Sequence, residues 1–71
     1  MDGVDNARLE MAAGIKRLRL KKGWSPGELG TRAGMTRQAV AMLEAGFYDP
    51  SVPAVRRLAK ALGVSPARII R

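Results

Sequence analysis

Arg37 and Gln38 stand side by side directly after Thr36, and both carry planar groups that can form paired hydrogen bonds. An arginine can donate two hydrogen bonds to O6 and N7 of guanine, and a glutamine can pair with N6 and N7 of adenine. Met42 follows one helical turn later, where it could touch a thymine methyl group or only cover the edge of a core. Outside a suitable fold, Arg37 and Gln38 would be ordinary solvated residues in the first turn of a helix.

Basic and hydroxyl side chains that could bind phosphate lie in the same part of the chain. A basic helix face is often merely solvated, and one helix cannot turn all its sides to one partner, so Arg17 and Lys21 are the favoured bases. Ser25 and Thr36 are expected to cap helices, and the free backbone amides beside such caps can also hold phosphate. The full set of basic candidates is Lys16, Arg17, Lys21, Lys22 and Arg32.

Several other residues keep open alternatives. Trp24 is expected to pack over the turn that follows the first helix. Phe47 and Tyr48 could pack against a later helix or meet a second copy of the chain, and Tyr48 could instead contact a phosphate backbone. A second group of bases is expected to be a solvated face, with phosphate contact as the alternative, and comprises Arg56, Arg57 and Lys60.

The composition excludes most catalytic and metal-binding chemistry. The 71 residues include neither cysteine nor histidine, so metal sites built on thiolate or imidazole and the usual catalytic triads are impossible. The 6 acidic residues show no pair at a spacing suited to a shared catalytic site. We therefore expect one small domain that is not an enzyme and that carries no metal or other cofactor.

The charge indicates the kind of partner. A net charge of +7 favours a polyanion, with nucleic acid as the leading candidate and an anionic membrane surface as the second. Residues 1–10 are slightly acidic, so the positive excess lies in residues 11–71. No apolar run approaches the ~20 residues that a membrane span needs. There is no basic segment followed by an apolar stretch at the N-terminus, so we expect no signal peptide and a cytoplasmic location.

Glycine and proline separate five segments whose apolar residues follow a helical period. The expected helices, with their caps, are residues 6–22, 25–33, 36–44, 51–62 and 65–70, which predicts an all-α fold. Residues 1–6 are expected to be a flexible tail, and residues 7–71 the folded domain. Gly14 weakens the first helix by about 1 kcal/mol relative to alanine. The expected core positions are Met11, Ile15, Leu18, Leu29, Ala33, Met35, Val40, Leu43, Val52, Val55, Leu58, Ala59 and Leu62.

The second and third helices have the marks of a helix-turn-helix. Ser25, Pro26 and Glu28 form the start signal of a capping box, and Gly34 lies in the turn between the two helices. Gly30 stands where the first helix of the pair must approach the second closely. The exposed face of the second helix would then be free to enter a major groove.

With these motifs in place, the sequence resembles the helix-turn-helix domain of phage lambda repressor, Cro and many small bacterial regulators, the XRE-like family. The resemblance covers residues 11–70 and keeps the order and spacing of its motifs. It is carried by IKRLRLKKGWS (15–25), EL (28–29), AGMT (33–36), Val40, LEAG (43–46), DPS (49–51) and LAKALGVS (58–65). It implies a five-helix fold that binds duplex DNA sequence-specifically, usually as a dimer.

The resemblance also implies roles for single residues. The base-reading positions of the family match Arg37, Gln38, Ala41 and Met42, and its buried ion pair matches Arg19 and Glu44. The family usually has glutamine where this chain has Pro26, whose side chain and backbone nitrogen donate no hydrogen bond. One contact to the DNA backbone is therefore in doubt.

The resulting hypothesis is a transcriptional regulator that binds an inverted-repeat operator as a homodimer. The alternative is an antitoxin-type module whose main surface binds a toxin protein and which also binds its own promoter. Two consecutive isoleucines point about 100° apart on a helix, so one can enter the core while the other stays exposed. The alternative is that both close the core of the monomer. The expected dimer contact is Val64, Pro66, Ile69 and Ile70. The operator sequence, and whether binding represses or activates, do not follow from the sequence.

Overall fold

The computed structural model describes the backbone of residues 3–70 and the side chains of residues 7–69, and its regular elements are all helices. They are α1 (Gly3–Lys21), α2 (Pro26–Ala33), α3 (Arg37–Glu44), α4 (Val52–Leu62) and α5 (Pro66–Ile70). Within the described residues, the all-α class and the order of five helices are confirmed. The expected start of the first helix at Asn6 is wrong: α1 begins at Gly3 and enters the segment expected as a tail, because no helix-breaking residue follows before Gly14.

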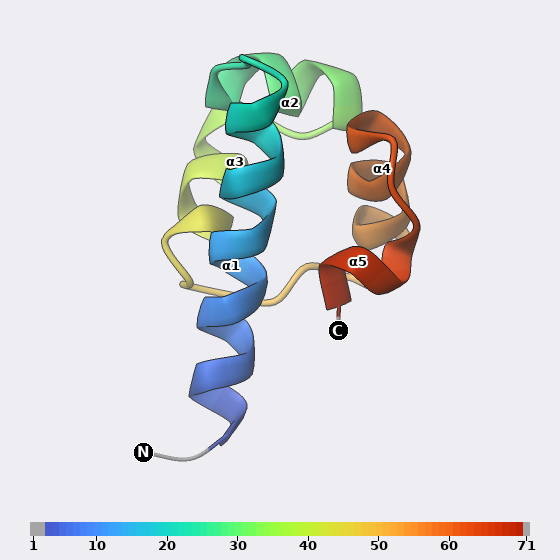
Figure 1. The fold of residues 1–71 in the computed structure, drawn as a ribbon. Helices are drawn as coiled ribbons and strands as arrows, with labels where there is room; N and C mark the ends of the chain where they lie inside the picture. Colours follow the sequence, from blue (N-terminus) through green and yellow to red (C-terminus); the bar gives the residue numbers. More distant parts are fainter. Residues whose placement is uncertain (1–2, 71) are drawn as a thin grey trace.

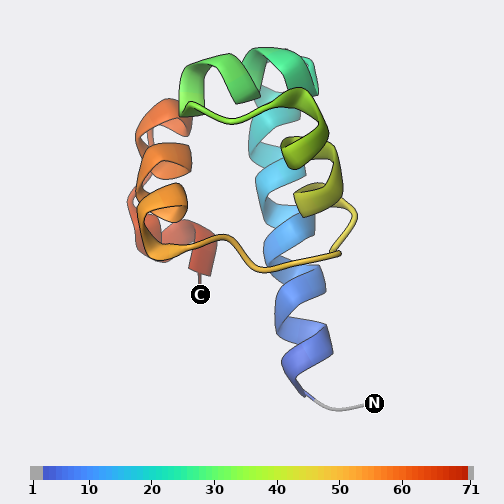
Figure 2. The ribbon, with the colours of Figure 1, turned by 180° about the vertical axis from the view of Figure 1, so that it is seen from behind.

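The helices enclose one core between them. α2 contacts both α3 and α4, and α1 contacts α3 and α5. α1 and α5 lie towards the viewer in Figure 1, whereas α3 lies towards the viewer in Figure 2, seen from behind. The largest fully buried side chains are those of Ile15, Leu29, Val40, Leu43 and Leu58. One residue from each of α1, α2 and α4 and two from α3 thus meet at the centre.

Hydroxyl side chains set the starts of three helices, as the sequence predicts. The backbone N–H groups of Glu28, Ala39 and Ala54 donate to the hydroxyls of the three N-cap residues, which are Ser25, Thr36 and Ser51. The reciprocal half of the capping box is not formed among the described residues. The Glu28 carboxylate instead accepts a hydrogen bond from Arg32 Nε, one turn further along α2, at 2.6 Å.

Most of the expected core is buried, and the exceptions lie at its edge. Met11, Leu18 and Met35 are only half-buried and pack against the cluster from outside. Val52 is 63% exposed, which corrects its assignment to the core. Val52 is the first residue of α4, and the first buried residue of that helix is Ala54. The apolar pattern of α4 therefore predicted one buried residue too many, at the first turn of the helix.

Two glycines make the α2–α3 crossing possible. A Cβ atom at Gly30 would lie 2.5 Å from the carbonyl oxygen of Met35, closer than real Cβ atoms approach. Gly34 ends α2 in the left-handed region, with φ of 69°, a conformation that favours glycine. The close approach of the helices therefore needs a residue without a side chain at position 30, and the turn needs the left-handed conformation of Gly34.

This packing predicts opposite effects for two alanine substitutions in α2. We expect Gly30→Ala to lower the free energy of unfolding by about 1–3 kcal/mol, because the new methyl group must push the backbone of the turn away. Gly27→Ala is the matched control: its Cβ would meet Arg37 Cδ at 3.5 Å, an ordinary contact, and stability should stay level or rise. Urea unfolding followed by circular dichroism measures both, and equal stability of the two variants would contradict the close crossing.

Candidate nucleic-acid interface

The outer face of α3 brings together the four residues expected to read bases. Arg37, Gln38, Ala41 and Met42 are all exposed, while Val40 and Leu43 on the other side of the helix are buried. Met42 is 39% exposed, so it is available for a contact outside the molecule. The arrangement presents two polar side chains in the first turn and an apolar surface one turn later.

The side chain of Arg37 is oriented by the neighbouring helix. A Cβ atom at Gly27 would lie 3.5 Å from Cδ and 3.7 Å from Cγ of Arg37. The aliphatic stem of Arg37 thus rests against the first turn of α2, and its guanidinium is left to the exterior. Gly27, an unusual residue in a helix start, thus lies beside Arg37, although an alanine would also fit there.

A buried ion pair holds α3 in place. Arg19 of α1 donates from Nε to Oε2 of Glu44 at 2.7 Å and from Nη2 to Oε1 at 2.9 Å. Both side chains are only 7% exposed. Nη1 of Arg19 also donates to the carbonyl oxygen of Trp24 at 2.7 Å, which ties the turn after α1 to the same group. The pairing expected between these two residues is present and has the paired geometry that makes such contacts strong.

Glu44 changes the pKa of Arg19 in the direction that keeps the guanidinium charged. The hydrogen bond to Glu44 raises the pKa of Arg19 above its ordinary value, against an opposing effect of burial, and the charge of Glu44 adds to the increase. A group whose pKa rises on folding stabilises the folded state fully at every pH below the pKa that the group has in the unfolded chain. Since the unfolded value already lies far above neutral pH, Arg19 stays charged and contributes no pH dependence near neutrality.

The candidate phosphate-binding residues fall into different environments. Lys21, Ser25 and Thr36 are exposed, although both hydroxyls already accept the helix-capping hydrogen bonds described above. Arg32 contacts two residues of the same protein, Trp24 and Glu28. Its guanidinium lies 4.4 Å from the centre of the Trp24 ring, in addition to its bond to Glu28. Trp24 packs against the core cluster and carries the Arg32 guanidinium on its ring.

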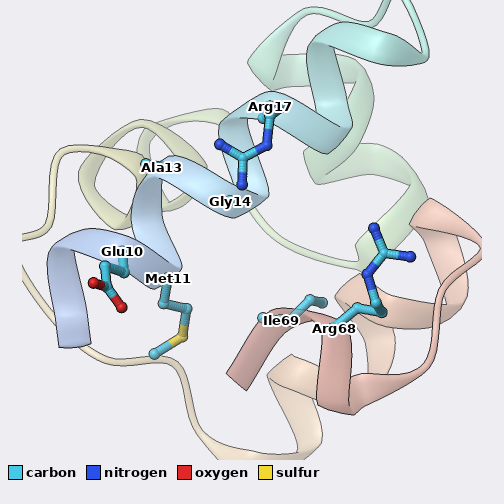
Figure 3. Close-up of a pocket in the computed structure, with 7 residues that line it drawn as sticks. All are labelled: Glu10, Met11, Ala13, Gly14, Arg17, Arg68 and Ile69. Atoms are coloured by element: carbon cyan, nitrogen blue, oxygen red, sulfur yellow. The ribbon is translucent and has the colours of Figure 1, made fainter. Parts of the chain in front are cut away.

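Two of the candidate phosphate-binding residues have neighbours within the fold. Arg17 of α1 lines a cavity together with Arg68 and Ile69 of α5 (Figure 3). Tyr48 donates its single hydroxyl proton to the carbonyl oxygen of Ala39 at 3.1 Å, so this proton is not free for a phosphate oxygen. Tyr48 instead anchors the α3–α4 loop on α3, while Phe47 beside it remains exposed.

The structure also shows roles that the sequence did not reveal. Arg57 of α4, expected on a solvated face, donates from Nε to the carbonyl oxygen of Ala33 at 2.9 Å and so caps the end of α2. Nε of Arg8 in α1 lies 3.7 Å from Oδ1 of Asp49 in the α3–α4 loop. Arg56, Arg57 and Lys60 look alike in the sequence, and only the packing of α2 on α4 distinguishes Arg57.

The residues expected at a dimer contact divide between core and surface. Ile69 is 2% exposed and belongs to the core cluster, so it cannot form the contact directly. Val64 is half-buried against the same cluster, and Pro66 is exposed. The side chain of Ile70 lies outside the described residues.

Two features are absent from the described part of the chain. No group of three or more histidine, cysteine, aspartate or glutamate side chains there is placed to hold a metal ion. None of the described helices is long and apolar enough to cross a membrane.

Comparison with known proteins agrees with this geometry. A helix-turn-helix family model matches residues 15–69. An uncharacterized HTH-type transcriptional regulator of Methanothermobacter thermautotrophicus is 43% identical over 49 residues, which cover 69% of this chain and 71% of that protein. The uncharacterized HTH-type transcriptional regulator YgzD of Bacillus subtilis is 40% identical over 50 residues, covering 70% of this chain and 76% of that protein.

A solved structure shows the same architecture over the whole chain. The crystal structure of a hypothetical transcription factor, NHTF, from Neisseria superposes with a TM-score of 0.88 and 28% sequence identity, covering 100% of this chain and 80% of that one. The chain belongs to the helix-turn-helix family of lambda repressor and Cro type, which confirms the resemblance stated from the sequence.

The ion pair predicts a large difference between two glutamate substitutions. We expect Glu44→Ala to lower the free energy of unfolding by about 3–5 kcal/mol, because it leaves the Arg19 guanidinium buried without its carboxylate. Glu28→Ala, which breaks a half-exposed pair, should cost less than about 1 kcal/mol. Thermal and urea unfolding of the two variants test this, and a small, equal loss would mean that Arg19 gains little from Glu44.

Proposed function

We propose that this protein is a transcriptional regulator that binds double-stranded DNA sequence-specifically with α3 in the major groove. The observation that carries the proposal is the division of α3 into two faces. Val40, Leu43 and Glu44 hold it on the body of the protein, and its four outer residues are exposed. A helix presented in this way is how helix-turn-helix proteins reach base edges.

The chemistry of the outer face supports readout of bases in a defined order. Arg37 suits guanine and Gln38 suits adenine, while Ala41 and Met42 suit the methyl group of thymine one helical turn further on. Backbone contacts would come from Lys21 and from the backbone amides at the starts of α2 and α3, where helix dipoles favour phosphate. Pro26 offers no such amide, so α2 contributes fewer donors than a helix without proline.

We further propose that two copies bind one operator. A single helix of 8 residues reads only a few base pairs, and a twofold dimer doubles this reading. The operator is then an inverted repeat with half-sites about 34 Å apart. The contact would lie at α5 and the connection before it, where Pro66 is exposed and Val64 is half-buried, with Ile70 assigned from the sequence alone.

Base reading by Arg37 is tested by comparing two kinds of DNA. After selection of a preferred duplex from a random pool, Arg37→Ala should weaken binding to it by about 1–3 kcal/mol and change binding to random duplex much less. Arg56→Ala, which removes an exposed arginine of α4, is the control and should affect both duplexes little. Equal losses on both duplexes for Arg37→Ala would show contact with phosphate only. Insensitivity of wild-type binding to salt would contradict DNA binding itself.

The dimer is tested by stoichiometry on the selected duplex. Sedimentation of the complex should give two protein chains per operator, and half-site spacing should alter affinity with the period of the DNA helix. Ile70→Asp should shift the complex towards one bound chain and leave binding to a single half-site unchanged. One chain bound to a site without a repeat would rule out the twofold arrangement.

A further inference from the structure

We infer that the cavity between α1 and α5 is a second binding site, which takes an acidic peptide segment of a partner protein. The cavity has a volume of about 300 Å³, at the lower end of the range for ligand sites and large enough for one or two side chains. Figure 3 shows it between the two helices, with Arg17 on α1 and Arg68 on α5 at its rim. The site is independent of the base-reading face of α3 and goes beyond the proposed DNA binding.

Two arginines at the rim give the site its preference for anions. Arg17 and Arg68 come from different helices, are both exposed and both line the cavity. Among the described residues, neither guanidinium has a carboxylate within ion-pair distance. Most other described arginines do have a partner in the fold. An incoming carboxylate would thus receive charge-assisted hydrogen bonds from groups that are not already engaged.

The rest of the lining favours a peptide in which an apolar side chain stands next to the acidic one. Met11 forms the accessible apolar part of the wall, beside the nearly fully buried Ile69, and its flexible thioether adapts to different shapes. Gly14 lines the same space, in the interior of α1. A Cβ atom there would meet only Nη2 of Arg17, at 3.9 Å, so the fold does not require glycine at this position. Its missing side chain leaves room for the ligand, although glycine weakens the helix.

A protein segment fits the charges better than nucleic acid does. Glu10 lies on the same lining, and its carboxylate would repel the successive phosphates of a nucleic-acid backbone. One acidic side chain followed or preceded by an apolar one can reach the arginines and avoid Glu10. The site also lies on the side of α1 that faces α5, whereas α3 lies on the other side of the molecule (Figures 1 and 2). A partner held there would leave α3 free for DNA.

The test is an NMR titration of the full chain, labelled with ¹⁵N, with the capped dipeptide acetyl-Leu-Glu-amide. We expect saturable shift changes in the millimolar range at the amides of Gly14, Arg17, Arg68 and Ile69, and none at Arg37. The neutral dipeptide acetyl-Leu-Gln-amide should bind about tenfold more weakly, because it lacks the charge. No shifts at these four amides up to about 20 mM peptide would overturn the proposal.

Variants separate binding from stability. Arg17→Gln and Arg68→Gln should each weaken the dipeptide several-fold, while Arg56→Gln, an exposed arginine elsewhere, should not. Gly14→Leu should fill the cavity and abolish binding while raising the melting temperature, a combination that loss of structure cannot produce. Gly14→Ala should keep both binding and fold. Retained binding in Gly14→Leu would place the dipeptide elsewhere and overturn the proposal.

Three other occupants are distinguished in the same titration. Inorganic phosphate that shifts the same amides as strongly as the dipeptide would make this a general anion site. Random duplex DNA that shifts them, beyond its effect on α3, would make it part of the nucleic-acid interface. Shifts of the Gly14 and Arg17 amides on simple dilution of the protein, beyond those of α5 that the proposed dimer contact would cause, would identify a second copy as the occupant. Each of these results would replace the acidic peptide.

Discussion

The contact between Arg19 and Glu44 is the constraint on which the useful geometry of this small protein depends. Two opposite charges leave water together, and their paired hydrogen bonds offset the cost of burying each one. The third bond from Arg19, to the carbonyl of Trp24, connects the turn after α1 to the same group. α3 has only 8 residues, too few to be stable alone. Its position is therefore set by this pair together with its buried face.

The crossing of α2 and α3 supplies the second part of the constraint. The absence of a side chain at Gly30 lets the turn of α3 approach α2, and the left-handed conformation of Gly34 redirects the chain between them. Arg57 then caps the end of α2 from α4. With one side of α3 held by these contacts, the other side cannot turn inwards. The outer face is exposed because the inner face has several specific partners.

The basic residues do not act as one surface. The net charge of +7 suggests a single polyanion-binding face, yet the structure distributes the arginines among separate tasks. Arg19 and Arg57 stabilise helix positions, and Arg32 is held between Glu28 and Trp24. Arg37 projects from α3, and Arg17 lines a cavity between α1 and α5. Charge alone therefore indicates the class of partner but not the residues that meet it.

Local physics made much of this protein predictable from its sequence. Helices begin after Ser25, Thr36 and Ser51 because each hydroxyl accepts a hydrogen bond from a backbone amide three residues later. The turn at Gly34 follows because glycine readily adopts the left-handed backbone conformation. The outer residues of α3 follow from helical period once that start is known. The pairing of Arg19 with Glu44 was expected from the resemblance, but the partners of Arg32 and Arg57 did not follow, because each of these side chains can reach several neighbours. Which neighbour lies within reach depends on how helices distant in the sequence pack together, and only the tertiary structure decides that.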